Sequence, residues 1–255
     1  MANDEFGGRV ALVTGGSRGI GRAICLRLAK AGAWVAINYS ASAEAAEETL
    51  RQVKAAAGDG QTYRADVSSF EATSAMYDVI ESDHGPVDLL VTNAGIATFK
   101  DNVDMPIDIW RQILAVNLDG TFHCVWRAKD GMRARNYGRI VCMSSINGLA
   151  PTVMHPERLI AYGTSKSAVI AFARNCATAF GPAIRINCVA PGLIDTDMTK
   201  DMSDDVRREI IAHTPAARTG KPEDVAELTY FLLSDAASFI TGQTCVTSGG
   251  LITLP

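Results

Sequence analysis

Short apolar runs alternate with helix-patterned segments along the whole chain, and this alternation restricts the fold more than any other feature. Each run is rich in β-branched residues and almost continuously apolar, as in strands buried on both faces of a parallel sheet. The predicted strands are 9–15, 34–40, 61–66, 88–95, 139–145, 184–192 and 242–250. The predicted helices are 19–31, 42–57, 69–83, 106–135, 164–180 and 222–234. The sequence therefore predicts one α/β domain over residues 1–255, a doubly wound parallel sheet of about seven strands with helices on both faces.

Two segments interrupt the alternation, and each directly follows a predicted strand. They are 149–161, "LAPTVMHPERLIA", and the polar, helix-prone 193–216. Open α/β sheets bind ligands beyond the carboxyl ends of their strands. We therefore expect a substrate loop at about 149–161 and a lid at about 193–216.

Charge and composition exclude several classes of protein. The net charge is −4, and Lys and Arg are scattered, whereas a nucleic-acid surface needs a basic stripe. No apolar run approaches the roughly 18–20 residues of a membrane span, and the N-terminus lacks the pattern of a signal peptide. The six cysteines form no CxxC pair and the four histidines no i,i+4 pair, so we predict no metal and no disulfide framework. We expect a cytoplasmic protein with neither a nucleic-acid nor a membrane partner.

The stretch "VALVTGGSRGIGRAI" (10–24) reads as a strand, a glycine-rich turn and the start of a helix. Gly15, Gly19 and Gly21 allow a tight turn, a close approach of a pyrophosphate and close packing of helix on strand. The helix N-terminus adds unpaired N–H groups and a positive dipole end. Against the alternative of a purely structural turn, we predict the Rossmann form of the fold, with a dinucleotide contacted by Gly15, Ser17, Arg18, Gly19, Ile20 and Gly21.

The end of the second predicted strand bears on which dinucleotide is bound. A carboxylate there would accept hydrogen bonds from the ribose of NAD, but "INYSAS" offers Asn38, Tyr39 and Ser40, with no acidic residue before Glu44. Arg18 can reach the same place, and its guanidinium suits a phosphate. NADP(H) is therefore favoured and NAD(H) remains possible. If Arg18 were only a solvated loop residue, this preference would lose most of its support.

A phenol and an ammonium lie one helical turn apart in "AYGTSK", at Tyr162 and Lys166. If the two share a cleft, the cation favours the phenolate and lowers the Tyr162 pKa toward a value useful for proton transfer. A lowering of about three units corresponds to roughly 4 kcal/mol. The alternative is a buried tyrosine with a satisfied hydroxyl beside a surface lysine.

Five motifs occur in an order that resembles the short-chain dehydrogenase/reductase family over about residues 8–250. They are "TGGSRGIG", "NAG", the "SS" that ends "RIVCMSS", "YGTSK" and "PGLIDTDM". Within that family the chain looks most similar to 3-oxoacyl-[acyl-carrier-protein] reductase-type members. The resemblance implies that Tyr162 is the general acid or base and that Lys166 lowers its pKa and binds the nicotinamide ribose. It also implies that Ser145 holds the substrate oxygen and that Asn117 positions a water in a proton relay.

The same resemblance implies the remaining cofactor contacts. Asp66 and Val67 would flank the adenine, and Asn93, Ala94 and Gly95 would line the ribose side. The nicotinamide carboxamide end would meet Pro191, Gly192, Ile194 and Thr196.

Two departures from the family pattern concern the substrate. Ser145 and Tyr162 are 17 positions apart, more than usual, which would reshape one wall of the substrate site. Asp130 interrupts the basic series Lys129, Arg133 and Arg135, so docking of an acidic acyl-carrier protein is doubtful. Relatives are usually tetramers, and the apolar C-terminal tail and the helix containing 167–180 fit a homotetramer.

The favoured function is that of an NADPH-dependent oxidoreductase, interconverting a 3-oxoacyl thioester or similar ketone and a secondary alcohol. One alternative keeps the chemistry but makes the protein an NAD-linked dehydrogenase of a sugar, steroid, diol or cyclic alcohol. Another, of a different class, is a non-catalytic nucleotide-binding or scaffold protein. The sequence does not identify the substrate.

Overall fold

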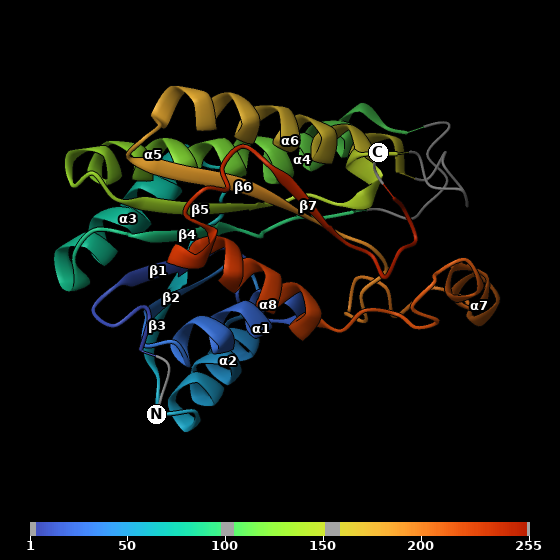
Figure 1. Cartoon of the computed structure of the whole chain (residues 1–255), viewed down its shortest axis with the longest axis horizontal. Helices are drawn as coiled ribbons and strands as arrows, with labels where there is room; N and C mark the ends of the chain where they lie inside the picture. The colour runs from blue at the N-terminus through green and yellow to red at the C-terminus, as the bar shows by residue number, and fades with distance from the viewer. Residues whose placement is uncertain (1–3, 98–104, 151–158, 254–255) are drawn as a thin grey trace.

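The computed structural model describes residues 4–97, 105–150 and 159–253. All seven strands are parallel and form one sheet in the order β3-β2-β1-β4-β5-β6-β7 (Figure 1). The strands are β1 (Val10–Val13), β2 (Trp34–Tyr39), β3 (Asp59–Arg64), β4 (Leu89–Thr92), β5 (Gly138–Met143), β6 (Ile184–Pro191) and β7 (Thr244–Thr247). This confirms the predicted doubly wound parallel sheet.

Helices cover both faces of the sheet, and they correspond to the predicted segments with three differences. They are α1 (Gly19–Ala29), α2 (Ala43–Ala55), α3 (Phe70–His84), α4 (Ile107–Leu114), α5 (Gly120–Ala134), α6 (Ile160–Phe180), α7 (Asp204–Ala212) and α8 (Pro222–Leu233). The helix predicted over 106–135 contains a π turn, η1 (Ala115–Asp119), between α4 and α5. Helix α6 begins before the predicted residue 164, and α7 forms inside the predicted lid.

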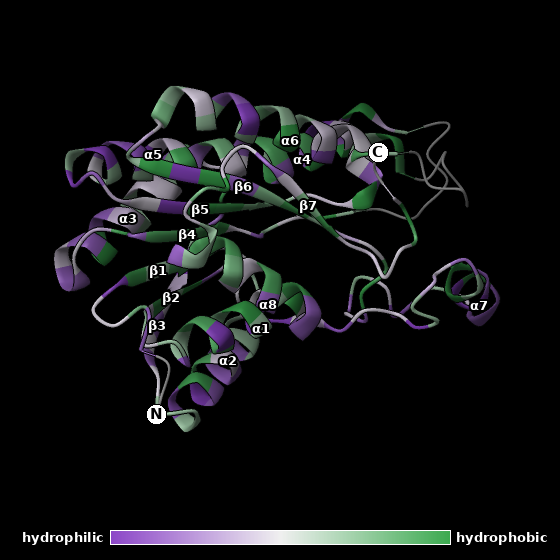
Figure 2. Ribbon diagram, in the orientation of Figure 1, coloured by the Kyte–Doolittle hydropathy of each residue, from purple (hydrophilic) through white to green (hydrophobic). Residues whose placement is uncertain are grey.

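Two apolar layers enclose the sheet and explain the near-continuous apolar strands. In β1, Ala11 and Val13 face the layer of α1 and α8, while Leu12 faces the layer of α3, α5 and α6. All residues of β1 and of β6 are buried. Figure 2 shows the hydrophobic strands at the centre of the molecule and hydrophilic residues on the outward helix surfaces.

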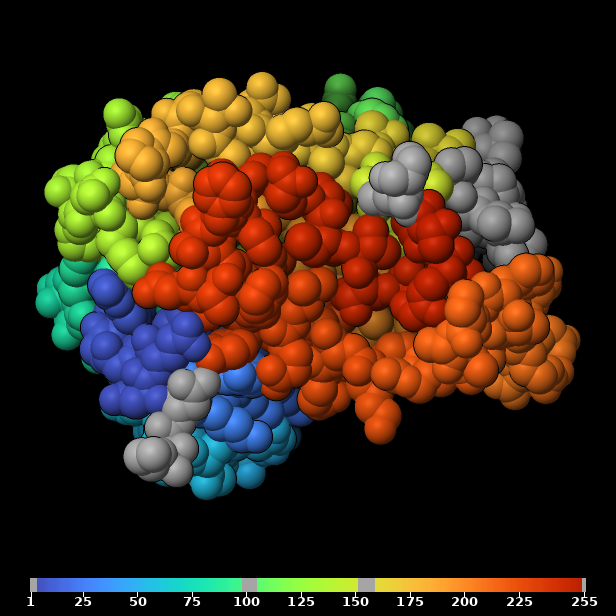
Figure 3. All heavy atoms as spheres, viewed as in Figure 1, coloured from blue at the N-terminus to red at the C-terminus, as the bar shows by residue number. Residues whose placement is uncertain are grey.

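The strand order reverses at the centre of the sheet, where β1 has β2 on one side and β4 on the other. Ligands of such sheets bind at this point, beyond the carboxyl ends of the strands. The segments after β5 and β6 both emerge at this end, and α7 projects from the body of the molecule there (Figures 1 and 3). Most of the predicted substrate loop, 151–158, lies outside the described residues.

No helix in the described ranges has the length and apolar character needed to cross a membrane. In the same ranges, no cluster of three or more His, Cys, Asp or Glu side chains could hold a metal ion.

Candidate active site

The glycine-rich turn between β1 and α1 has the backbone shape that its sequence predicts. Gly15 and Gly19 have φ values of +62° and +53°, a region that favours glycine. A Cβ on Gly21 would lie 2.1 Å from the Gly15 carbonyl oxygen, so α1 can begin this close to the turn only with glycine there. Ser17 is buried, and its carbonyl oxygen accepts hydrogen bonds from Arg22 and Thr49. The turn is therefore fixed from behind while the N-terminus of α1 faces the cleft, as an anion site requires.

Asn93 and Thr14 join the turn to the end of β4. The Asn93 side-chain amide donates to the carbonyl oxygens of Thr14 and Gly15, at 3.0 and 3.1 Å. The Thr14 hydroxyl accepts the backbone N–H groups of Asn93 and Ala94, both at 3.0 Å. The two side chains hold the strand ends together at the reversal of strand order, leaving Gly95 to line the cleft. The sequence analysis did not include Thr14 among the site residues. Its position at the end of the first strand is the sequence feature that could have indicated this role.

Asn38, at the end of β2, is buried and its amide is used inside the protein. Its Oδ1 accepts the Gly15 N–H at 3.3 Å, and its Nδ2 donates to the carbonyl oxygens of Tyr63 and Ala65. It thus fastens the glycine turn to β3. The neighbouring Tyr39 is half-buried and Ser40 is exposed, so these two are more open to a ligand than the Asn38 amide.

Arg18 reaches the end of β2, as predicted. Its Nη2 lies 3.5 Å from the Ser42 hydroxyl, and its Nη1 lies 3.4 Å from a carboxylate oxygen of Asp197 in the lid. Thr196 of the lid meets the glycine turn directly, because a Cβ on Gly19 would lie 3.3 Å from its methyl group. The Arg18 guanidinium therefore joins three segments: the glycine turn, the loop after β2 and the lid.

Asp66 and Val67 follow β3 and are held in a tight turn. Asp66 accepts hydrogen bonds from the backbone N–H and the hydroxyl of Ser68. Val67 is buried against Gly120, where a Cβ would lie 2.7 Å from a Val67 methyl. The predicted adenine-flanking pair thus lies at the carboxyl end of its strand.

One cleft brings together three of the four predicted catalytic side chains, all but Asn117, and the predicted nicotinamide-end residues. Of the predicted site residues it is lined by Ile20, Asn93, Gly95, Ser145, Tyr162, Lys166, Pro191, Gly192, Ile194 and Thr196. Lining residues that the sequence analysis missed are Met143, Ser144, Met198 and Thr199. Each is close in the sequence to a predicted site residue, and this proximity is the one sequence feature that could have indicated a role in the cleft.

Lys166 is buried at the base of this cleft, with a relative exposure of 3%. Its Nζ donates to the Met143 carbonyl oxygen at 2.8 Å and lies 5.7 Å from the centre of the Tyr162 ring. Burial lowers the pKa of Lys166 to about 8, because an ammonium is poorly solvated there. The lysine can therefore exchange a proton close to neutral pH.

The electrostatic influence on Tyr162 differs from the sequence-based expectation. Burial of the hydroxyl raises the pKa of Tyr162, and a hydrogen bond from Ser145 opposes this by lowering it. We expected Lys166 to lower that pKa, but in the protein alone this influence does not appear. The physical reason is that the ammonium is directed to the Met143 carbonyl and is itself destabilised by burial.

Asn117 lies in the π turn η1, and its side-chain amide makes three hydrogen bonds to two residues. Its Oδ1 accepts the Ile96 N–H at 2.8 Å, and its Nδ2 donates to Ile96 O and to the Ser165 hydroxyl, each at 3.0 Å. It thereby clamps the chain after β4 to α6. A Cβ on Gly95 would lie 3.3 Å from Asn117 Oδ1 and 3.4 Å from Lys166 Nζ, so both groups border the same glycine. A π turn inside a helix frequently marks a functional position.

Gly148 is a further residue that the sequence analysis missed. It lies in the short helical turn η2 (Ile146–Gly148), and a Cβ there would be 2.7 Å from the Lys166 carbonyl carbon and 2.9 Å from Ser144 Oγ. Ser144 Oγ in turn donates to Lys166 O at 2.9 Å. The loop bearing Ser145 therefore lies directly against the backbone of α6.

We expect Gly148→Ala to push this loop away from α6, lowering the free energy of unfolding by about 1–3 kcal/mol and reducing turnover. Gly131→Ala is the matched control, because its Cβ would meet only the flexible end of Arg135 at 3.3 Å. That variant should be neutral or slightly stabilised, since alanine favours a helix. Urea unfolding of both variants measures the difference, and equal stabilities would contradict the close approach.

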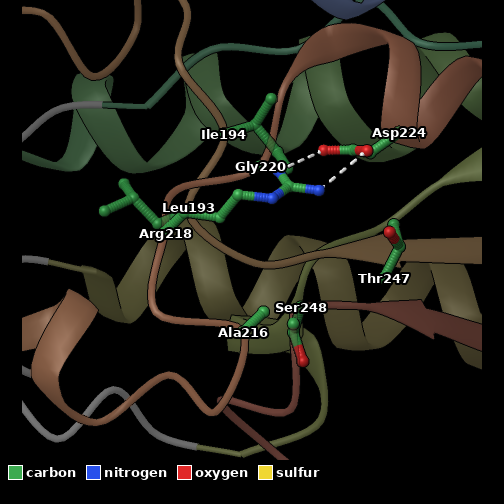
Figure 4. Close-up of a pocket in the computed structure, with 9 residues that line it drawn as sticks. Leu193, Ile194, Ala216, Arg218, Gly220, Asp224, Thr247 and Ser248 are labelled. Atoms are coloured by element: carbon green, nitrogen blue, oxygen red, sulfur yellow. Dashed lines mark hydrogen bonds and ion pairs between the residues drawn. The ribbon is translucent and has the colours of Figure 1, made fainter.

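The lid is tied to the body by a polar network beside a second cavity (Figure 4). Arg218 makes a two-pronged ion pair with Asp224 of α8, with its nitrogens 2.7 and 3.1 Å from the carboxylate oxygens. Asp195 accepts hydrogen bonds from Arg207 of α7 and from the Thr219 hydroxyl. These bonds fix both ends of the lid, so Ile194 and Thr196 are held at the cleft wall.

The fold and the site together define a class of protein. A glycine-rich turn lies between the first strand and the first helix, and a cleft at the same end of the sheet contains a tyrosine, a serine and a buried lysine. This arrangement is that of a nicotinamide-nucleotide-dependent oxidoreductase acting on a CH–OH group.

Comparison with known proteins identifies the family. A family model described as enoyl-(acyl carrier protein) reductase matches residues 15–252. The chain is 38% identical to 3-oxoacyl-[acyl-carrier-protein] reductase of Staphylococcus aureus, covering 94% of this chain and 97% of that one. It is 37% identical to acetoacetyl-CoA reductase of Allochromatium vinosum, covering 95% and 98%. The structure of a 7α-hydroxysteroid dehydrogenase complexed with NADH and 7-oxo glycochenodeoxycholic acid superposes with a TM-score of 0.91 at 32% identity, covering 97% and 96%. The chain belongs to the short-chain dehydrogenase/reductase family.

Proposed function

We propose that this enzyme uses NADPH to reduce a 3-oxoacyl thioester or a similar ketone to a secondary alcohol, with Tyr162 as the general acid. The observation that carries the proposal is the shared cleft of Ser145, Tyr162 and Lys166 at the end of the sheet where the glycine turn opens. The names of the reductases similar to this chain support the substrate class.

The residues would hold the cofactor in an extended arrangement along the carboxyl ends of the strands. The glycine turn and the N-terminus of α1 would take the pyrophosphate, Gly95 would line the ribose side, and Gly192 and Thr196 would border the nicotinamide end. When bound, the reduced nicotinamide supplies the hydride. The protein's part is to orient the ketone and to deliver one proton to its oxygen.

Ser145 and Tyr162 would share the work at the substrate oxygen. Both side chains line one cleft, so a carbonyl oxygen between them would accept a hydrogen bond from each hydroxyl. The two donors stabilise negative charge as it develops on that oxygen. A raised Tyr162 pKa keeps the phenol protonated, which is the form that a reductase needs before each turnover.

Lys166 would replace the proton that Tyr162 donates. Its pKa of about 8 lets the ammonium release a proton near neutral pH and regain one from solvent. Asn117 would keep the path in place as a positioning residue, because its amide clamps Ile96 and Ser165 on either side. The water predicted beside Asn117 would have to use a second lone pair of its side-chain or backbone oxygen, since these oxygens already accept the Ile96 N–H and the Thr121 hydroxyl.

NADPH is favoured over NADH by the groups at the end of β2. Arg18 lies against Ser42, and no carboxylate precedes Glu44 in this loop. The alternative of an NAD-linked dehydrogenase of a steroid or another alcohol keeps some support, because the similar 7α-hydroxysteroid dehydrogenase is described with NADH.

A substrate carried on coenzyme A or free in solution is favoured over one on an acidic carrier protein. On α5 and its C-terminus, Lys129 pairs with Asp130, Arg127 with Asp78 and Glu81, and Arg135 with Asp88. Basic side chains already neutralised within the chain attract an acidic partner weakly.

The direct test is NADPH oxidation with 3-oxoacyl-CoA thioesters, simple ketones, quinones, oxosteroids and sugars, compared side by side and repeated with NADH. We expect the highest kcat/KM for a 3-oxoacyl thioester with NADPH. A preference for NADH with a steroid or sugar would favour the alternative. No turnover across the panel would point to a non-catalytic nucleotide-binding protein.

We also propose a homotetramer. Phe122 and Trp126 stack on the outer surface of α5, with ring centres 5.1 Å apart, and both side chains are substantially exposed. Phe172 of α6 meets Phe122 edge-on, so the aromatic surface continues across two helices. Such a surface is a candidate interface between copies. Sedimentation as a single chain would contradict it.

A further inference from the structure

We propose that Arg64, the last residue of β3, joins Arg18 in binding the 2′-phosphate of NADP, and that the two guanidinium groups together set the cofactor preference. This inference rests on the proposed NADPH dependence and adds a residue that neither the motif pattern nor the glycine turn indicates. It concerns the short loop 40–42 at the carboxyl end of β2.

The strand register places Arg64 at this loop. Strands β2 and β3 are parallel, and Arg64 pairs with Tyr39, the last residue of β2. The Nε of Arg64 donates to the Ser40 carbonyl oxygen at 3.3 Å. Arg18 approaches the same loop from the glycine turn, with its Nη2 3.5 Å from the Ser42 hydroxyl. Two guanidinium groups thus meet a loop of three residues from opposite sides of β2.

Arg64 has hydrogen-bonding capacity left for a ligand. The side chain is exposed, the Ser40 carbonyl uses only its Nε, and it has no ion pair within the described part of the chain. The nearby Glu47 on α2 is engaged by the Thr62 hydroxyl at 2.7 Å. The two Nη groups of Arg64 can therefore offer the planar pair of donors that suits a phosphate.

The hydrogen-bond donors around the loop suit an anion, because Ser40 and Ser42 add hydroxyl groups to the two guanidinium groups. The acidic groups at hand are Asp197, paired with Arg18, Glu44 in the first turn of α2, and Glu47, which accepts the Thr62 hydroxyl. The Arg18–Asp197 pair is exposed on both sides, so it is weak and an arriving phosphate dianion can compete for Arg18. Arg64 forms no ion pair within the described ranges, which makes it the more readily available of the two cations.

Arg64→Gln tests the proposal through binding, which requires no turnover. Fluorescence titration should show the Kd for NADPH raised about tenfold, with the Kd for NADH changed less than twofold, because only NADPH carries the 2′-phosphate. Calorimetry with two cofactor fragments that lack the nicotinamide should show the same difference. The substitution should weaken binding of adenosine 2′,5′-bisphosphate, which carries the 2′-phosphate, and leave binding of AMP nearly unchanged. Arg133→Gln is the control, since it removes an exposed arginine at the far end of α5 with the same change in charge.

The outcomes separate this proposal from the proposed function. Equal weakening of NADPH and NADH, or no change in either, would overturn the role of Arg64 even in an active NADPH reductase. A selective loss of NADPH binding would support it even in a protein that reduces no ketone. Arg64→Lys should recover only part of the NADPH affinity, because an ammonium keeps the charge without the paired donors.

Discussion

Tyr162→Phe is expected to lower kcat for ketone reduction by about 10³-fold while leaving the Kd for NADPH nearly unchanged. The substitution removes a single hydroxyl from the cleft that it shares with Ser145 and Lys166. Without it the substrate oxygen has no acid to protonate it. The aromatic ring remains in the variant, so the cleft keeps its shape and the surface that would contact the cofactor is unchanged. Stopped-flow or steady-state NADPH oxidation measures the rate, and fluorescence titration measures the affinity.

Tyr137→Phe is the matched control for this variant. The Tyr137 ring lies between the guanidinium groups of Arg9 and Arg139, 3.8 and 4.2 Å from its centre, away from the cleft. Loss of its hydroxyl should leave kcat within about twofold, since the substitution changes neither ring nor charge. If Tyr162→Phe kept a tenth or more of the wild-type rate, the proton would have to come from another group, and the proposed mechanism would fail.

The sheet was predictable because each strand can be recognised from the apolar pattern of its own residues. A strand such as "VALVTG" is apolar on both faces, which is typical of strands that helices cover on both sides. The π turn at 115–119 was not predictable, because its residues have an ordinary helical pattern and the hydrogen bonds of Asn117 within it join residues far apart in the sequence. The helix α7 agrees with the helix-prone character of the predicted lid, although the sequence did not give its bounds.

The sequence predicted which residues meet in the candidate site better than it predicted the contacts that these residues make. Sequence order placed Ser145, Tyr162 and Lys166 in one cleft, since each follows a strand or opens a helix at the same end of the sheet. It could not foresee that the Met143 backbone carbonyl would take the lysine, because backbone partners leave no trace in residue identity. For the same reason, the sequence led us to expect that Lys166 lowers the Tyr162 pKa. In the structure, the residue that lowers this pKa is Ser145.

Lys166→Met is expected to remove most of the activity and to change how stability depends on pH. The Lys166 pKa is about 8 in the folded protein and 10.5 in the absence of the fold. Below pH 8 the lysine is charged in both states, and the folded protein bears the full cost of burying the ammonium. Between pH 8 and 10.5 it is neutral when folded and charged when unfolded, so the unfolded state binds the extra proton and stability rises with pH.

Wild-type protein should therefore gain up to about 3 kcal/mol in unfolding free energy relative to Lys166→Met between pH 7 and pH 10.5. The difference between the two proteins is the useful quantity, because other groups that titrate in this range are common to both. Urea unfolding at fixed protein concentration, at several pH values, measures it. Lys54→Met, which removes an exposed lysine in the last turn of α2, controls for the loss of a positive charge. A constant difference across the range would mean that Lys166 is not held as a buried ammonium, and the proton relay assigned to it would lose its physical basis.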